Sequence, residues 1–379
     1  MALQRTIKSF CMVISLFAVG GCLESYYPPA TNERVGYLVV DGYLNTTKSV
    51  ATVKLSRTLG ISIAESFPEE SNAKVSIESD QGDIYPLNEM GNGIYSQTGI
   101  NAQDGKSYQL HIKTSDGNEY LSKNIQFKSS PSLDSIIWKP DADGITLHVN
   151  AHDDTNKTHY YKWNFVETWQ YTSTFFSYFK FVDGVPTPRT PADYIFNCWK
   201  TAHEDQVLIT STVPLNADVV HDFPLVTIPR GSIKLSHRYS ILVEQRALDD
   251  DAYNYWSLLK KTTENLGGLF DPLPSQVTGN VYNINNSNEP VLGYFGGGNA
   301  QEKRIFILFS DLPDHLQTYS TGLYCTQGLV PVGKLSANGG QVLINAVGTP
   351  VPTDFFVSTP DCSDCRVNGG STIKPDFWP

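Results

Sequence analysis

Tyr37-Leu-Val-Val-Asp-Gly-Tyr43, followed by Ala51-Thr-Val-Lys-Leu55, is the stretch of sequence that decides the fold class. The first segment is a nearly continuous apolar run, whereas in the second every other residue is apolar. Alternation with period two is typical of a strand that buries one face of an antiparallel sheet. Similar alternation returns at 75–77 and 108–112, and glycine-containing turns separate the segments. Residues 35–128 are therefore predicted to form an immunoglobulin-like or transthyretin-like β-sandwich.

The N-terminus carries the features of an export signal in their usual order. Arg5 and Lys8 precede an apolar run, Phe10–Val19, that is too short to span a bilayer. The small residues Gly20-Gly21 before Cys22 resemble a bacterial lipobox, in which the cysteine thiol takes a diacylglycerol and becomes the new N-terminus. The alternatives are an ordinary signal peptide with a chance cysteine and an uncleaved anchor.

This signal sets the organisation of the exported chain. Residues 1–21 are predicted to be removed, and residues 22–34, which contain a Pro-Pro pair, to form a lipidated spacer. Acyl chains on Cys22 would tether the protein to a membrane. Removal of the signal leaves 379 − 21 = 358 residues, which suffice for two or three domains. No later segment reaches the roughly 18 consecutive apolar residues of a membrane-spanning helix.

The acidic composition disfavours some classes of partner. The chain has 39 acidic and 28 basic residues, and its formal net charge is −11. The signal holds Arg5, Lys8 and no acid, so its removal takes the charge to −13. Such a surface argues against binding to nucleic acid or to anionic lipid. With 40% hydrophobic and 12% aromatic residues, the chain is predicted to be globular.

Residues 129–379 are predicted to form a larger β-rich domain that follows a joint at Ser129-Ser130-Pro131. One amphipathic helix is expected at about 249–265. Three acids, Asp249–Asp251, suit its first turn, and apolar residues then recur at helical spacing. Calcium binding by these acids is disfavoured, because they lack the spacing of an EF-hand loop. The last 40 residues, rich in Gly, Pro and Asn, are predicted to be irregular.

Four cysteines remain once the signal and the lipidation site are set aside. An even number of cysteines in an exported chain favours two disulfides, and three pairings are possible. A zinc site and a redox-active Cys-x-x-Cys are the alternatives, but a redox motif normally begins a helix, whereas this one precedes a Gly-Gly pair. We predict structural disulfides that hold the C-terminal tail, with the pairing left open, among Cys198, Cys325, Cys362 and Cys365.

An aromatic block at 160–181 is the best candidate for a surface site. Its first part alternates like an ordinary core strand, but its second part is too dense in aromatic residues to be buried on one face. Exposed aromatic rings stack on sugars or anchor protein interfaces. Burial in the core is the default interpretation, ahead of a protein interface and a carbohydrate site. The candidate loop residues are Trp169, Tyr171, Phe175, Phe176, Tyr178 and Phe179.

Other candidate chemistry is weak. His148 and His152 would share one face of a strand, but Asp153-Asp154-Thr155-Asn156-Lys157 has the composition of a hairpin turn rather than of a metal site. The glycine-rich Gly293–Gly298 lacks the Lys-Ser/Thr of a phosphate-binding loop, and is expected to be a strand that ends in a flexible turn. No serine-hydrolase or zinc-protease motif occurs. We therefore expect no catalytic residue, metal or cofactor, although a hydrolase with dispersed carboxylates is a minor alternative.

Several short motifs, taken together and in order, resemble one family. They are Leu38-Val-Val-Asp-Gly42, Tyr239-Ser-Ile-Leu-Val-Glu244, Leu269-Phe-Asp-Pro-Leu-Pro-Ser275 with Gly279-Asn280, Val291-Leu-Gly-Tyr-Phe295, and the segment from Cys362 to Trp378. Through these motifs the chain resembles the domain-of-unknown-function 4249 lipoproteins of the Bacteroidota. The resemblance implies an outer-membrane lipoprotein of a kind commonly encoded beside TonB-dependent outer-membrane transporters, and it supplies no catalytic residues.

Our leading hypothesis is a non-enzymatic lipoprotein that assists a TonB-dependent outer-membrane transporter in nutrient capture. A surface-exposed orientation is expected. A periplasm-facing one stays open, because surface-exported lipoproteins of this group often carry a strongly acidic stretch after the lipidated cysteine, whereas Leu23-Glu24-Ser25-Tyr26 holds a single acid. The alternative is a surface module that binds a glycan or peptide on its own. In both hypotheses the aromatic block supplies the contact surface.

Overall fold

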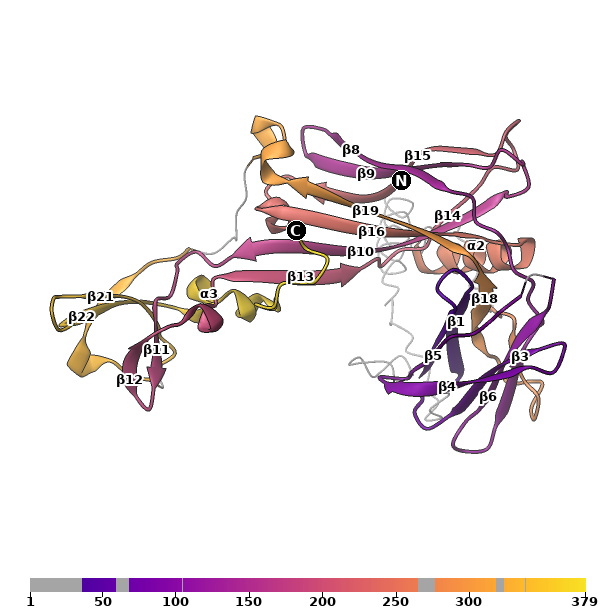
Figure 1. Cartoon of the computed structure of the whole chain (residues 1–379), viewed down its shortest axis with the longest axis horizontal. Coiled ribbons are helices and arrows are strands. Elements are labelled where there is room, and N and C mark those ends of the chain that lie inside the picture. The colour runs from indigo at the N-terminus through magenta and orange to yellow at the C-terminus, as the bar shows by residue number, and fades with distance from the viewer. Residues whose placement is uncertain (1–35, 59–67, 104, 265–276, 318–323, 338) are drawn as a thin grey trace, which may run out of the picture.

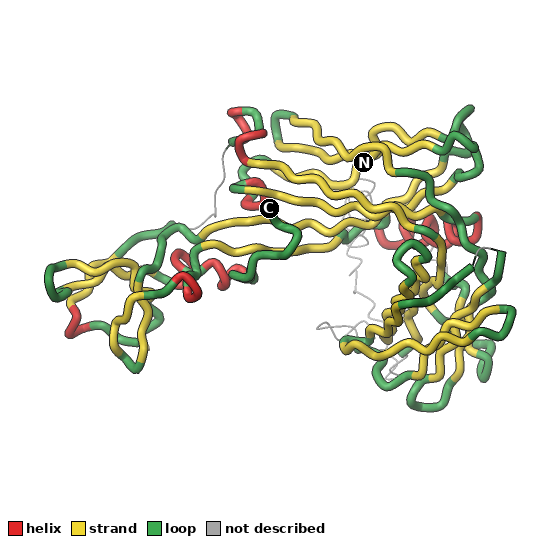
Figure 2. The backbone as a smooth tube through the Cα atoms, in the orientation of Figure 1, coloured by secondary structure: helices red, strands yellow, loops and turns green. Residues whose placement is uncertain are grey.

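The computed structural model describes residues 36–58, 68–103, 105–264, 277–317, 324–337 and 339–379. The predicted signal, Cys22 and the whole of the predicted spacer lie outside the described residues. The predicted mainly β class is confirmed. Figures 1 and 2 show three parts, which we call the N-terminal body, the central sandwich and the distal lobe. Among the described residues, no helix has the length and apolarity needed to cross a membrane.

The N-terminal body is a single nine-stranded sheet folded around one core. Strand β4 pairs with β3 through its first half and with β5 through its second, so the sheet turns there and encloses the core. The alternating residues of β1 and β2 point into this core, as the sequence pattern predicted. In spatial order the strands are β17 (Val281–Asn283), β7 (Glu119–Ser122), β6 (Tyr108–Lys113), β3 (Lys74–Ser79), β4 (Ile84–Gly91), β5 (Ile94–Thr98), β2 (Val50–Arg57), β1 (Leu38–Asn45) and β18 (Leu292–Gly298).

Two strands of this body come from far along the chain. β18 pairs in parallel with β1, from Val39 beside Leu292 to Asn45 beside Gly298, and β17 pairs with β7. The predicted boundary at 128/129 therefore does not separate the sheets completely. Glycine permits the close approach: Gly293 has a φ of +105°, and a Cβ there would lie 1.8 Å from the carbonyl oxygen of Val40. The strand expected at Gly293–Gly298 is present, but it does not end in a flexible turn within this segment, because all six residues belong to β18.

The side chain of Asn280 forms hydrogen bonds with the backbone at the outer edge of β18. Its Nδ2 donates to the Phe295 carbonyl at 2.7 Å, and its Oδ1 accepts from the Phe295 N–H at 2.9 Å. Asn280 is itself buried. The amide thus takes the place of a further strand, and it fixes the segment before β17 against β18.

The central sandwich packs a five-stranded sheet against a three-stranded one. The first sheet has the order β13-β10-β16-β19, with β14 also paired to β10, and the second has the order β15-β9-β8. One apolar core fills the space between them. The strands are β8 (Leu133–Pro140), β9 (Gly144–His152), β10 (Tyr160–Thr172), β13 (Asn197–His203), β14 (Leu208–Ser211), β15 (Val219–Pro229), β16 (Arg238–Ala247) and β19 (Ala300–Leu308). Short 3-10 turns η2 (Ile233–Leu235), η3 (Phe309–Asp311) and η4 (Asp314–Leu316) border them.

The predicted helix is confirmed as α2 (Asp250–Glu264). The Asp249 carboxylate accepts the N–H of Ala252 at 2.7 Å, so the acid acts as a helix cap. Ala252 and Tyr255 on the buried face pack against Tyr294 of β18. The helix therefore lies between the central sandwich and the N-terminal body (Figure 1).

The distal lobe comprises residues 173–196 and 324–364, with residue 338 not described. It extends beyond the ends of β10 and β13, at the left of Figure 1. The prediction that the last 40 residues are irregular is partly wrong, because short strands pair there across glycine and proline turns. Its elements are β11 (Phe179–Val182), β12 (Val185–Pro188), η1 (Pro191–Asp193), β20 (Gly328–Pro331), η5 (Val332–Lys334), β21 (Val342–Val347), β22 (Asp354–Ser358) and α3 (Pro360–Ser363); η6 (Cys365–Asn368) follows at its base.

The position of Asn280 gives a first prediction. Replacing Asn280 with alanine leaves both backbone groups of Phe295 without their partner in a buried site, which should lower the free energy of unfolding by about 1–3 kcal/mol. Urea denaturation followed by circular dichroism measures this. Asn88→Ala, at an exposed position of β4, is the matched control and should change stability little. Equal stability of the Asn280 variant and the control would contradict the assigned role.

Candidate functional site: a disulfide-braced lobe and a pocket between the sheets

The four candidate cysteines form two disulfides, Cys198–Cys365 and Cys325–Cys362. The structure thus resolves the pairing that the sequence left open. The two cysteines of the Cys-x-x-Cys segment belong to different disulfides, so they form no redox-active pair with each other. Bonded cysteines also offer no thiolate to zinc, which removes the zinc alternative for this state of the chain.

Both disulfides act on the distal lobe. Cys325–Cys362 closes a loop within it, whereas Cys198–Cys365 joins β13 to η6 at its base. Tyr171 at the end of β10 supports the same junction, since its hydroxyl donates to the Cys365 carbonyl at 2.7 Å. The lobe's own core contains few fully buried side chains, namely Leu343, Phe355 and Val357. A core of this size is marginal on its own, and cross-links compensate for it.

The aromatic candidates divide between core and surface. Trp169 and Tyr171 are only 6% and 2% exposed and lie in the core of the central sandwich, so their assignment to a surface loop is wrong. The cause is the length of β10, which continues to Thr172 and keeps these rings on its buried face. Phe179 packs edge-on against Phe355 in the lobe core.

The remaining candidates border the surface of the distal lobe. Tyr178 is 51% exposed, while Phe175 and Phe176 are half-buried. The Phe176 ring lies 4.5 Å from that of Tyr178 and 4.9 Å from that of Tyr194, which the sequence analysis did not single out. These rings form an exposed aromatic cluster.

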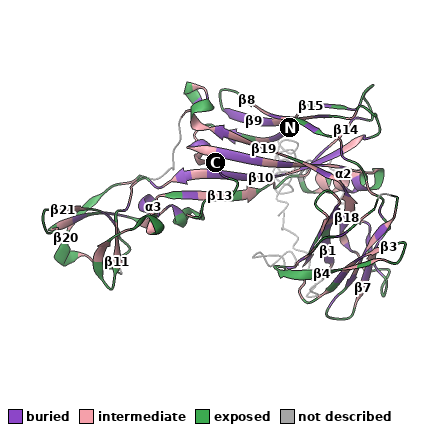
Figure 3. Ribbon diagram, viewed as in Figure 1, coloured by how far each residue is buried: buried purple, intermediate pink, exposed green. Residues whose placement is uncertain are grey.

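Exposed apolar side chains gather on this lobe (Figure 3 shows its exposed segments in green). On the three-stranded sheet, Leu329 lies directly opposite Phe356, and both are exposed. Apolar exposure gathered in this way usually marks an interaction surface. The sequence analysis missed most of these positions because they are scattered along the chain. The exposed large apolar residues of the lobe are Tyr178, Val182, Val185, Tyr194, Tyr324, Leu329, Val332, Val351 and Phe356.

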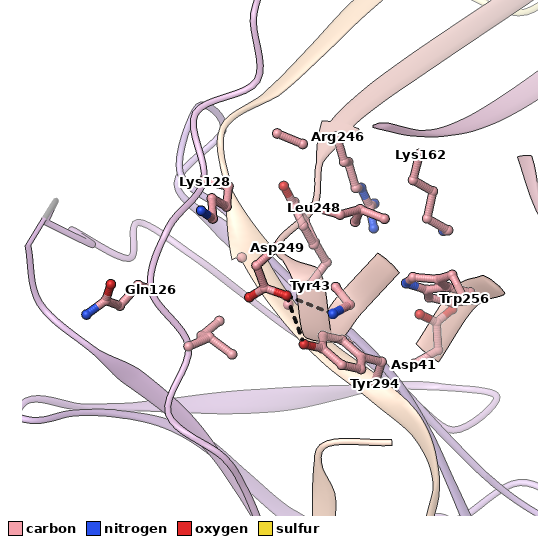
Figure 4. A pocket seen from close by; sticks show the side chains of 16 residues that line it. Asp41, Tyr43, Gln126, Lys128, Lys162, Arg246, Leu248, Asp249, Trp256 and Tyr294 are labelled. Atoms are coloured by element: carbon pink, nitrogen blue, oxygen red, sulfur yellow. Dashed lines mark hydrogen bonds between the residues drawn. The ribbon is translucent and has the colours of Figure 1, made fainter. Parts of the chain in front are cut away.

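A second candidate site lies between the N-terminal body, α2 and the five-stranded sheet. We call this small, partly open hollow the junction pocket (Figure 4). Its charged lining is Lys162 and Arg246 from the central sandwich, Asp41 from β1, Asp249 before α2, and Lys128 from the linker. Its aromatic lining is Tyr43, Trp256 and Tyr294, and Gly296 of β18 adds no side chain to the wall that faces Tyr43 and Tyr294.

Lys162 is the least ordinary residue of the junction pocket. It is 8% exposed; its Nζ donates to Asn164 Oδ1 at 2.8 Å and lies 4.1 Å from the centroid of the Trp256 ring. Among the described residues, no carboxylate oxygen lies within 4.0 Å of this ammonium. Burial, and next the charge of Arg246, lower the pKa of Lys162 to about 8.

The other charged groups have defined partners. Arg246 stacks on the Tyr43 ring at 3.7 Å and pairs with Glu244 at 2.5 Å. Burial raises the pKa of Tyr43 to about 12, against the opposing effect of Arg246. Figure 4 shows that Asp249 reaches both Tyr294 and the first turn of α2. The pocket therefore contains a paired arginine and a capping acid beside a lysine that has no ion pair among the described residues.

The histidine and acid cluster at 148–159 is a turn, as expected, but it does not join a hairpin. β9 and β10 belong to different sheets, so the turn crosses the sandwich. Asp153 accepts hydrogen bonds from Thr155 and Thr158; although burial raises its pKa, these bonds hold the pKa well below its usual range. His152 pairs with Asp134 at 2.7 Å. Within the described part of the chain, no group of three metal-ligating side chains occurs.

Comparison with known proteins identifies the family. Residues 24–304 match the family described as "Domain of unknown function (DUF4249)". The chain belongs to the DUF4249 family. The match includes both walls of the junction pocket and the first part of the distal lobe, and it ends before the second part. The motif from Cys362 to Trp378, which contributed to the resemblance, lies outside the matched residues of this DUF4249 protein. No curated protein matches the chain.

The disulfides give a second prediction. In the Cys325→Ser/Cys362→Ser double variant, the distal lobe should lose about 3 kcal/mol of local stability, because its loop is no longer closed in the unfolded state. Limited proteolysis should then cut within 324–364 several-fold faster, while the N-terminal body stays intact as an internal control. The corresponding variant of Cys198 and Cys365, whose separation is 167 rather than 37 residues, should be affected more strongly. Unchanged cleavage of the lobe would refute the bracing role.

Proposed function

We propose that this protein is a non-enzymatic outer-membrane lipoprotein, anchored through Cys22, that assists a TonB-dependent transporter in nutrient capture. The distal lobe is its docking surface for the transporter. The family resemblance supports the tether and the class of partner. The observation that carries the docking role is the exposed apolar surface on a disulfide-braced lobe that extends beyond the central sandwich.

The placement of the exposed side chains favours a protein partner. Leu329 and Phe356 are neighbours across two strands, and Tyr178 and Tyr194 share a ring cluster with Phe176. Aromatic and large apolar residues form the central contacts of protein interfaces, because they remove much area from water at a low cost in side-chain entropy. Disulfide bracing reduces the ordering that such a lobe must undergo on binding.

The alternative, a module that binds a peptide or glycan on its own, is supported by a different feature. An open groove lies between β14 and β15, at the side of the central sandwich. Phe165, Leu208 and Leu225 line it, and Glu167 pairs with Lys234 at 2.6 Å within it. Ligand sites combine apolar side chains with convergent polar groups, as this groove does. We rank it second, because Glu167 and Lys234 already bind each other.

The docking proposal predicts the outcome of a crosslinking pulldown from the native membrane, read by mass spectrometry. A TonB-dependent barrel should be recovered with the wild-type protein. Leu329→Asp/Phe356→Asp should lower this recovery at least about tenfold, since interface anchors contribute about 2 kcal/mol each. Both side chains are exposed, so the melting temperature should not change.

A matched control substitutes two exposed apolar residues of the N-terminal body. Ile84→Asp/Met90→Asp introduces the same charges on β4 and should leave recovery of the barrel unchanged. Absence of any barrel, with the protein still accessible to external protease, would favour the stand-alone binding module. Equal loss in both double variants would show that charge, and not the distal lobe, determines recovery.

A further inference from the structure

We propose that the junction pocket binds a free α-amino acid. The carboxylate of the ligand lies toward Lys162 and Arg246, and its ammonium group lies toward Asp41. The inference rests on the arrangement of charges in the pocket and does not depend on the docking role of the distal lobe.

On the cationic side of the pocket, two positively charged residues lie directly opposite each other in a sheet. β10 and β16 are antiparallel, and Lys162 lies directly opposite Arg246 in their register. Like charges at directly opposed positions destabilise a sheet. The next opposed pair, Asn164 and Glu244, supplies one carboxylate, and that carboxylate already binds Arg246. The Lys162 ammonium is therefore held in a buried site beside a second cation, which favours an incoming carboxylate.

The acidic side of the pocket lies on β1. Asp41 is exposed, and among the described residues no cationic nitrogen lies within 4.0 Å of it. Its charge nevertheless acts on Lys162, whose pKa it raises against the effects of burial and of Arg246. Two opposite charges thus face the same hollow without touching. A ligand that carries an ammonium and a carboxylate on the same carbon complements this arrangement. A simple anion or cation would contact only the cationic or only the acidic side of the pocket.

The walls suit the carbon part of such a ligand. Gly296 contributes no side chain; a Cβ there would meet the rings of Tyr43 and Tyr294 at 3.7 and 3.9 Å, which is ordinary contact distance. The rings of Tyr43, Trp256 and Tyr294 give the pocket apolar surface. Asp249 Oδ1 accepts from the Ala252 N–H and the Tyr294 hydroxyl, whereas Asp41 is exposed, so we assign the ammonium to Asp41. These walls also leave room for a substitution that fills the pocket without backbone strain.

The test uses the detergent-solubilised lipidated protein, labelled with 5-fluorotryptophan. Each proteinogenic L-amino acid is added separately, and both the melting temperature and the 19F signal of Trp256, assigned with Trp256→Phe, are followed. At least one amino acid should raise the melting temperature with increasing concentration, because ligands stabilise the state that they bind. It should also shift the Trp256 signal, since Lys162 lies over that ring.

Two sets of controls separate the parts of the proposal. Acetate and methylammonium each carry only one of the ligand's two charged groups. Each should bind at least about tenfold more weakly than the amino acid, as expected for the loss of one charged contact. Lys162→Met and Asp41→Asn should each abolish binding, and Lys74→Met, an exposed lysine on β3 away from the pocket, should not. Gly296→Val should block binding while all charges remain.

The two possible roles of Lys162 predict opposite effects of Lys162→Met on stability. If the lysine served the fold, its replacement would lower the melting temperature. Replacing a buried cation that has no ion pair with an apolar side chain of similar length removes a desolvation penalty, so Lys162→Met should melt at a higher temperature than the wild type without ligand. The proposal is overturned if no amino acid shifts either signal. It is also overturned if acetate binds as tightly as the amino acid, or if Lys162→Met or Gly296→Val keeps full binding.

Discussion

The parallel pairing of β1 with β18 is the contact on which the rest of the structure depends. It joins residues about 250 positions apart in the chain, and it brings the N-terminal body against α2 and the central sandwich. Without it, Asp41 and Tyr43 would not line the same pocket as Lys162, and the junction pocket would have only one wall. Such non-local pairings form late, because the entropy of closing the intervening chain opposes them. The close approach requires Gly293, and Asn280 satisfies the backbone that the pairing leaves open.

Local signals explain what the sequence could predict. The alternation in β1 and β2, the acid before α2, and the alternating first part of β10 each specify an element within a dozen residues. Each also reports which face is buried, since the side-chain period differs between strand and helix. The mainly β class, the helix and the core position of Tyr161 and Trp163 follow from these signals alone.

Features that depend on distant partners could not be predicted in this way. The burial of Trp169 and Tyr171 depends on the continuation of β10 beneath the second sheet, and the dense aromatic composition suggested a loop instead. The strands of the distal lobe are short, and they become ordered through pairing across long separations and through two disulfides. The junction pocket takes residues from five separate segments, so no local motif marks it.

One strand connects the two candidate sites. β10 carries Lys162 near its start and Tyr171 near its end, and Tyr171 holds the base of the distal lobe through Cys365. Nine residue steps separate these positions, which corresponds to about 30 Å of extended strand. A strand paired on both edges and packed on a sheet is stiff, so a ligand in the pocket and a partner on the lobe would be held at a nearly constant separation. This arrangement suits delivery to a fixed partner better than transmission of a conformational change, because one continuous strand joins the two sites.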